Sequence, residues 1–139
     1  MKYYAVVDTN VLVSAFLKEN SIPWKILNYI RSLVIVPIYS EDILKEYNRV
    51  LRENNFGLSD EIIENTINLI KTVGIGLESS LNIDEYFPDS DDIKFYRIVM
   101  SSRMVVDPNS RLITGNQKHF PVKEFVVSPS EMVDIIEEK

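Results

Sequence analysis

The fold is decided by the stretch Tyr4-Ala5-Val6-Val7-Asp8-Thr9-Asn10-Val11-Leu12-Val13-Ser14. An apolar, β-branched run that stops at a polar tripeptide and then resumes predicts a buried strand that turns directly into a helix. Asp8 would then lie at the carboxyl end of the strand, where open α/β sheets keep their binding sites. We expect Asn10 to cap the helix and the Thr9 hydroxyl to orient the carboxylate or reach a bound group. A turn or capping role alone would also explain Asp8.

The length and composition are those of a folded protein with one domain. The chain has 139 residues, of which 45% are apolar and 26% charged. We therefore expect a single domain over residues 1–139 with a substantial core. The sequence contains no cysteine, which excludes disulfides and thiolate zinc sites and favours a reducing cytoplasm. We expect no secretory leader and no membrane span.

The acidic balance of the chain limits how it could bind nucleic acid. The 21 acidic and 15 basic residues give a net charge of −6, which argues against binding by bulk electrostatic attraction. A nucleic-acid substrate held through metal ions is not excluded, because carboxylates that hold divalent cations present a positive face.

Short apolar runs alternate with amphipathic stretches along the rest of the chain. Further strands are expected at residues 33–37, 112–114 and 125–127, with a weaker edge strand after residue 75. Further helices are expected near residues 23–32, 40–54, 59–73, 88–103 and 128–138. Strands that alternate with helices predict a three-layer α/β/α fold around a mainly parallel sheet of four to five strands.

Polar residues that could carry chemistry lie at or beside the predicted strand ends. They are Asp8, Asp92 with its acidic neighbours, the segment Thr114-Gly115-Asn116, and Glu46 on a helix that follows a strand. Because the carboxyl ends of parallel strands meet at one crevice, we expect these carboxylates to converge. Like charges so close together need compensation, which a bound cation supplies. Oxygen ligands without His or Cys suit Mg²⁺.

Four blocks of sequence carry a resemblance to a known family, and they follow one another along nearly the whole chain. They are Val6-Val7-Asp8-Thr9-Asn10-Val11-Leu12-Val13-Ser14, Ile43-Leu44-Lys45-Glu46-Tyr47-Asn48-Arg49-Val50-Leu51, Pro88-Asp89-Ser90-Asp91-Asp92-Ile93-Lys94-Phe95-Tyr96 and Leu112-Ile113-Thr114-Gly115-Asn116-Gln117-Lys118-His119-Phe120-Pro121. In this order the blocks resemble the PIN-domain ribonuclease family. The resemblance is greatest to its VapC-like branch, the toxin components of toxin–antitoxin pairs.

The resemblance implies a Mg²⁺- or Mn²⁺-dependent endoribonuclease that acts on single-stranded RNA. Asp8, Glu46 and Asp92 match the acidic metal-binding residues of the family, which implies that these three residues are catalytic. Asn116 stands where many members have a fourth acid, and its amide oxygen is a weaker ligand because it brings no charge. The resemblance also implies a homo-oligomer and an antitoxin protein as a partner. No membrane association is expected, because the longest apolar runs are far short of a membrane span.

The predicted chemistry is metal-assisted hydrolysis of a phosphodiester. Ions held by the three acids would lower the pKa of a bound water and offset the charge on the scissile phosphate, so no side-chain nucleophile is needed. We expect Thr9, Asn10, Thr114 and Asp89 to support the metal-binding acids through hydrogen bonds and helix capping.

Several of these residues also have simpler explanations. Glu46 could be an exposed acid of an amphipathic helix that pairs with a neighbouring cation. Capping and the helix dipole account for two of the three acids at positions 89, 91 and 92. We assign the third to metal binding, with Asp92 as the first choice and Asp89 or Asp91 as its substitute. His119, the only histidine, is expected to be structural.

Three cations share the predicted helix of Glu46, and two interpretations of them remain open. Lys45, Arg49 and Arg52 could form a solvated helix face. They could instead contact RNA phosphates beside the crevice, because they lie on the same helix as a predicted metal ligand.

Other functions compete with the nuclease hypothesis. A catalytically weak PIN-like module could bind RNA or a protein partner without cleavage, and Asn116 together with the acidic composition favours it. A phosphatase with an aspartyl nucleophile would need a second Asp at the position of Asn10. A phosphorylated receiver domain would need a paired acid and a late lysine at a strand end, and neither is found in register.

Overall fold

The sheet is the centre of the molecule. The computed structural model describes residues 1–138, apart from the side chain of residue 54. Its five strands all run parallel in the order β3-β2-β1-β4-β5. They are β1 (Tyr3–Val7), β2 (Ile35–Tyr39), β3 (Ile75–Gly76), β4 (Arg111–Ile113) and β5 (Val126–Val127).

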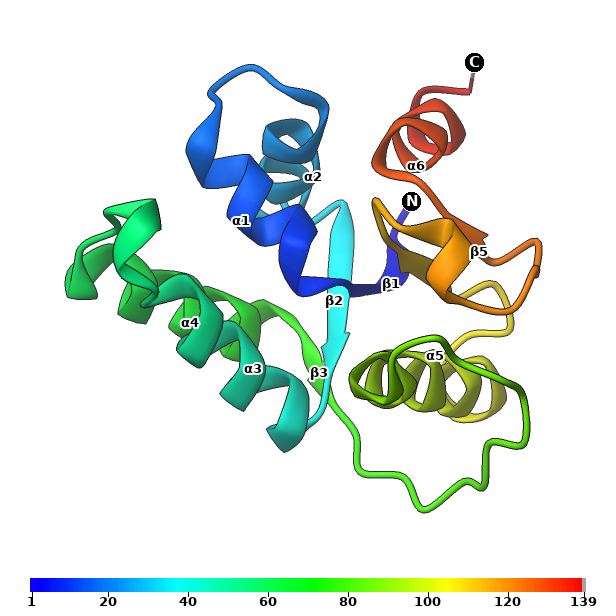
Figure 1. The fold of residues 1–139 in the computed structure, drawn as a ribbon. Helices are drawn as coiled ribbons and strands as arrows, with labels where there is room; N and C mark the ends of the chain where they lie inside the picture. Colours follow the sequence, from blue (N-terminus) through cyan, green and yellow to red (C-terminus); the bar gives the residue numbers. More distant parts are fainter. Residues whose placement is uncertain (139) are drawn as a thin grey trace.

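Helices cover both faces of this sheet. They are α1 (Thr9–Leu17), α2 (Ile22–Arg31), α3 (Glu41–Leu51), α4 (Asp60–Val73), α5 (Ile93–Val105) and α6 (Pro129–Glu137), with single 3₁₀ turns η1 (Asn54–Phe56), η2 (Ser90–Asp92) and η3 (Gln117–His119). Helix α5 contacts β1, β2 and β4 on one side, while α2 contacts β2, α1 and α6 on the other (Figure 1). The predicted three-layer α/β/α fold is confirmed. None of the helices within residues 1–138 is both long and apolar enough to cross a membrane.

Strand β1 is buried on both faces and lies at the switch point of the sheet, where later strands are added on its opposite sides. Ala5, Val6 and Val7 are at most 1% exposed, as expected for a central parallel strand with an apolar run. From β1 the chain continues to β2 on one side, and β4 is later added on the other side. Crevices at the carboxyl ends of strands at such a switch point are the usual ligand sites of open α/β sheets.

The turn after β1 differs from the prediction in one detail. Asn10 was expected to cap the first helix, but α1 begins at Thr9 and Asp8 occupies the N-cap position with extended backbone angles. Because the chain passes from strand to helix with no loop between them, the cap falls two residues earlier. Asn10 is an exposed residue of the first helical turn.

The second strand also extends beyond its predicted end. Pro37 was expected to end it at 37, but β2 continues to Tyr39 and Pro37 lies inside it. The neighbouring strand β3 pairs only with Ile38 and Tyr39. A proline, which has no N–H to donate, is therefore tolerated at position 37.

Serine caps fix the starts of four helices. The hydroxyls of Ser21, Ser40, Ser59 and Ser128 each accept a hydrogen bond from the amide three residues later. Ser128 forms a full capping box, since the Glu131 side chain also accepts from the Ser128 amide. Each such cap contributes about 1 kcal/mol to helix stability.

We expect Gly74→Ala to destabilise the protein. A Cβ at Gly74 would overlap the carbonyl oxygens of Pro37 and Ile70, both of which are backbone atoms that cannot move aside cheaply. We expect a loss of about 1–3 kcal/mol in the free energy of unfolding, measured with urea. Gly115→Ala is the matched control, because no atom lies within 4 Å of the place that its added methyl group would take; equal stabilities of the two variants would contradict this account.

Candidate active site

Asp8 is a nearly buried acid at the end of β1. Asp8 is 5% exposed, and its Oδ2 accepts a hydrogen bond of 2.7 Å from the hydroxyl of Thr114, which follows β4. Burial raises the pKa of Asp8 above its ordinary value, and the negative charge of Glu46 raises it further. The hydrogen bond from Thr114 and the backbone amides of Asn10 and Thr9 oppose that rise in pKa.

Glu46 has a partner for each of its carboxylate oxygens. The Thr9 hydroxyl donates to Oε2, and the Lys94 ammonium lies 2.8 Å from Oε1. The side chains of Glu46 and Lys94 are 12% and 22% exposed. Glu46 is therefore a well-held, compensated acid and not the exposed member of a solvated helix face.

Asp92 is the least compensated acid of the site. Its Oδ2 is buried and accepts no hydrogen bond, since His119 Nδ1 lies 3.6 Å away, beyond hydrogen-bond length. Burial raises the pKa of Asp92 to about 6, helped by the charges of Asp8, Asp89 and Glu46 and opposed by His119. Asp89 itself caps η2 by accepting from the Asp91 amide, which is the capping role that the sequence suggested for part of this cluster.

These three acids come from separate parts of the chain and lie close enough to affect one another. Asp8 follows β1, Glu46 lies on α3 after β2, and Asp92 immediately precedes α5. The charges of Asp8 and Glu46 both raise the pKa of Asp92. Folding therefore gathers them at one edge of the sheet, although their assignment as catalytic residues remains a prediction.

The oxygen atoms of this site are suitable ligands for a divalent cation, but their present positions do not form a complete metal site. Carboxylate, hydroxyl and amide oxygens are the ligands of Mg²⁺ and similar ions, and the unpartnered Oδ2 of Asp92 is a buried oxygen that such an ion would satisfy. Among the described residues, however, no three Asp, Glu, His or Cys side chains already converge on one point. Lys94 instead supplies the positive charge beside Glu46.

The residues expected to support the acids take different positions. Thr9 and Thr114 are buried and donate to Glu46 and Asp8. The backbone amide of Asn116 donates to the Thr114 hydroxyl at 3.0 Å, which places Asn116 beside the site. Asn10 acts through its backbone amide, because its side chain is exposed.

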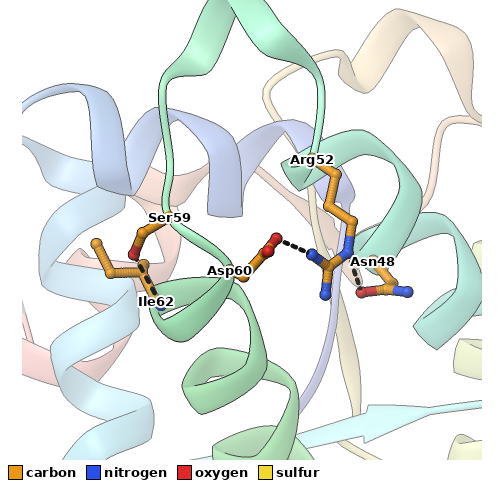
Figure 2. Close-up of polar contacts among 5 residues, drawn as sticks. All are labelled: Asn48, Arg52, Ser59, Asp60 and Ile62. Atoms are coloured by element: carbon orange, nitrogen blue, oxygen red, sulfur yellow. Dashed lines mark hydrogen bonds and ion pairs between the residues drawn. The ribbon is translucent and has the colours of Figure 1, made fainter.

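Arg52 lies apart from the other two cations of its helix. Its guanidinium pairs with Asp60 and donates to Asn48 Oδ1 at 3.0 Å, beside the Ser59 cap that starts α4 (Figure 2). Lys45 and Arg49 instead line a groove next to Glu46. The structure therefore gives Arg52 the role of linking the end of α3 to the start of α4.

Sequence reasoning missed three residues near the acids. Lys94 was not singled out, although a lysine in the first turn of a helix opposes the helix dipole and could have served as a signal. His119, which was expected to be structural, lies beside Asp92, a position that the sequence did not predict. Tyr47 was not singled out either, yet its hydroxyl donates to the Val7 carbonyl, a long-range contact without a local sequence signal.

The fold and this group of acids define an α/β protein with a carboxylate site at the switch point of a parallel sheet. A family model described as the PIN domain matches residues 4–118. The chain therefore belongs to the PIN domain family, whose members are generally nucleases that use divalent metal ions. Uncharacterized protein MJ1680 of Methanocaldococcus jannaschii is 27% identical over 148 aligned residues, which cover 99% of this chain and 94% of that protein. No solved structure matches the chain significantly.

We expect Asp92→Asn to remove a pH dependence of stability. A carboxyl group whose pKa is about 6 in the folded state and near 4 when unfolded binds protons more tightly when folded. Its contribution to stability is therefore present at low pH and lost as the pH rises to 6 and above. In EDTA at pH 7.5 the variant should be more stable than the wild type, by about 1.4 kcal/mol for each unit of raised pKa. Urea unfolding at pH 5 and 7.5 measures this, and a variant less stable than wild type at pH 7.5 would refute it.

We expect Lys94→Met to weaken the fold and strengthen the effect of divalent cations. The change leaves Glu46 without its cation in a mostly buried position, which should cost about 1–3 kcal/mol. Because the acid group then carries more net negative charge, Mn²⁺ should raise the melting temperature of the variant more than that of the wild type. Lys71→Met, on an exposed residue in the last turn of α4 that does not line the groove beside Glu46, is the control. Equal Mn²⁺ shifts in all three proteins would count against this role of Lys94.

Proposed function

We propose that the protein is a metal-dependent endoribonuclease that cleaves single-stranded RNA with water as the nucleophile. The observation that supports this most directly is that Asp8, Glu46 and Asp92 lie near the switch point of the sheet, close enough for the charge of Glu46 to raise the pKa of the other two acids. Membership of the PIN domain family supports the nuclease class independently. We further propose that the protein acts in the cytoplasm.

In this proposal the three acids hold one or two Mg²⁺ or Mn²⁺ ions, and Asn116 contributes a weaker, uncharged oxygen. When bound, such an ion lowers the pKa of water and offsets the charge on the scissile phosphate. Thr114 fixes the orientation of the Asp8 carboxylate, and Thr9 does the same for Glu46. Thr114 engages only Oδ2 of Asp8, whereas Oε1 of Glu46 would become available as a ligand only once Lys94 moves away from it.

We also propose that the protein is the toxin of a toxin–antitoxin pair and forms a homo-oligomer. The support is the resemblance of four sequence blocks to the VapC-like branch of the family. An open reading frame for a small antitoxin-like protein, immediately upstream and overlapping, would support this role. Copurification of that small protein with this chain after joint expression would test the partnership directly.

A second candidate function is RNA binding without cleavage. Two observations favour it: Asn116 brings no charge where many family members have an acid, and both oxygens of Glu46 are already engaged by Thr9 and Lys94. Titration with Mn²⁺ followed by a nuclease assay separates the two functions, because only the first requires cleavage once the metal is bound.

We expect Asp8→Asn to abolish metal-dependent cleavage of single-stranded RNA and to leave the fold intact. The amide has the same shape as the carboxylate but no negative charge, so it weakens cation binding without opening a cavity. Cleavage of a labelled oligonucleotide, followed on a gel with Mn²⁺ or EDTA, measures the effect, and circular dichroism checks the fold.

Glu61→Gln provides the control for this experiment, because Glu61 is an exposed acid in the first turn of α4. It should cleave like the wild type. Unchanged cleavage by the Asp8 variant would remove the assignment of Asp8, and the nuclease mechanism with it.

A further inference from the structure

A groove with a volume of about 400 Å³ adjoins the acid site between α3 and α5. Glu46 and Lys94, which form the ion pair of the site, are both among its lining residues. The groove and the group of acids are therefore continuous, and a chain lying in the groove would reach the acids without leaving the protein surface.

Basic side chains line this groove from both helices. Lys45 and Arg49 come from α3, and Lys94 and Arg97 come from α5. Residues three or four apart share one face of a helix, so the two pairs lie along facing sides of the groove. The acids that line it are Asp42, Glu46 and Asp91, so cations are in slight excess here although the whole chain has a net charge of −6.

The cations of α3 have no ion-pair partner among the described residues, whereas those of α5 are held in place. Neither Lys45 nor Arg49 takes part in any of the ion pairs of residues 1–138. Arg97 donates through Nε to the Leu81 carbonyl at 3.0 Å, which anchors its guanidinium while leaving its terminal nitrogens for a ligand. If Lys45 and Arg49 contributed only to stability, we would expect them to form ion pairs, as Arg52 does with Asp60.

We propose that this groove binds the phosphate backbone of single-stranded RNA and leads it to the acid site, an inference that rests on the proposed nuclease function. Unpaired cations along a groove bind phosphates and release counterions. No aromatic side chain is among the lining residues, so the groove contacts the backbone and does not stack bases. Binding is therefore independent of sequence, and Lys94 marks the point where the backbone passes from the groove to the acids.

The test is a salt titration of RNA binding without metal. Binding of a fluorescently labelled, single-stranded RNA is followed by anisotropy in EDTA, so that no cleavage occurs. We expect R49Q to reduce the slope of a plot of log binding constant against log salt concentration by about 0.7 in magnitude, which is the value for one lost phosphate contact on a single strand. R49Q with R97Q should reduce it by about twice as much, to the same extent on RNAs of different sequence.

R52Q is the matched control, because Arg52 is a cation at the end of the same helix that lies outside the groove and pairs with Asp60. It should bind with the salt dependence of the wild type. Arg49 is exposed and has no ion-pair partner in the described chain, so R49Q is expected to fold normally even if R97Q disturbs the contact with Leu81.

The outcomes separate this inference from the proposed function. If the wild type cleaves RNA with Mn²⁺ while R49Q and the double variant keep its salt dependence, the groove assignment is wrong and the nuclease proposal stands. Equal losses in R52Q and R49Q, or equal affinity for duplex and single-stranded RNA, would also overturn the groove assignment. A wild type that neither binds nor cleaves RNA would overturn both.

Discussion

The placement of three negative charges in a nearly closed part of the fold is the constraint on which the rest of the structure depends. Ionised carboxylates are costly to bury unless charges or hydrogen bonds offset them. Two hydroxyls, two backbone amides at the start of α1 and one ammonium offset Asp8 and Glu46. These donors come from the ends of β1 and β4 and from α5, so the arrangement of the strands and the compensation of charge are linked.

Much of this arrangement follows from local sequence signals. The run before Asp8, the serine caps and the capping box at Ser128 specify strands and helices through neighbouring residues, and the sequence predicted them with small errors in their ends. The error at Asn10 arose because no loop separates β1 from α1, so the helix begins earlier than predicted. The error at Pro37 arose because β3 pairs with β2 only at residues 38 and 39, so a proline fits inside β2. Neither fact can be deduced from the stretch in which it appears.

The sequence did not predict which polar side chains contact the acids. Thr114 and Asp8 are separated by 106 positions, and Lys94 and Glu46 belong to different helices. The family resemblance supplied the acids but not the lysine that compensates one of them. Placing Arg97 in the groove, and removing Arg52 from it, likewise required the packing of α3 beside α5.

The hydroxyl of Tyr47 joins the helix that carries Glu46 to the strand that carries Asp8. Tyr47 is 1% exposed and donates to the Val7 carbonyl, and burial keeps its pKa well above the ordinary value, so it remains a donor at any physiological pH. A sliding movement of α3 along the sheet would break this buried bond, which typically costs about 1 kcal/mol or more. The bond thus opposes, from inside the molecule, any change in the separation of the two acids, and a binding partner on the outer surface of α3 would have to break it in order to pull the acids apart.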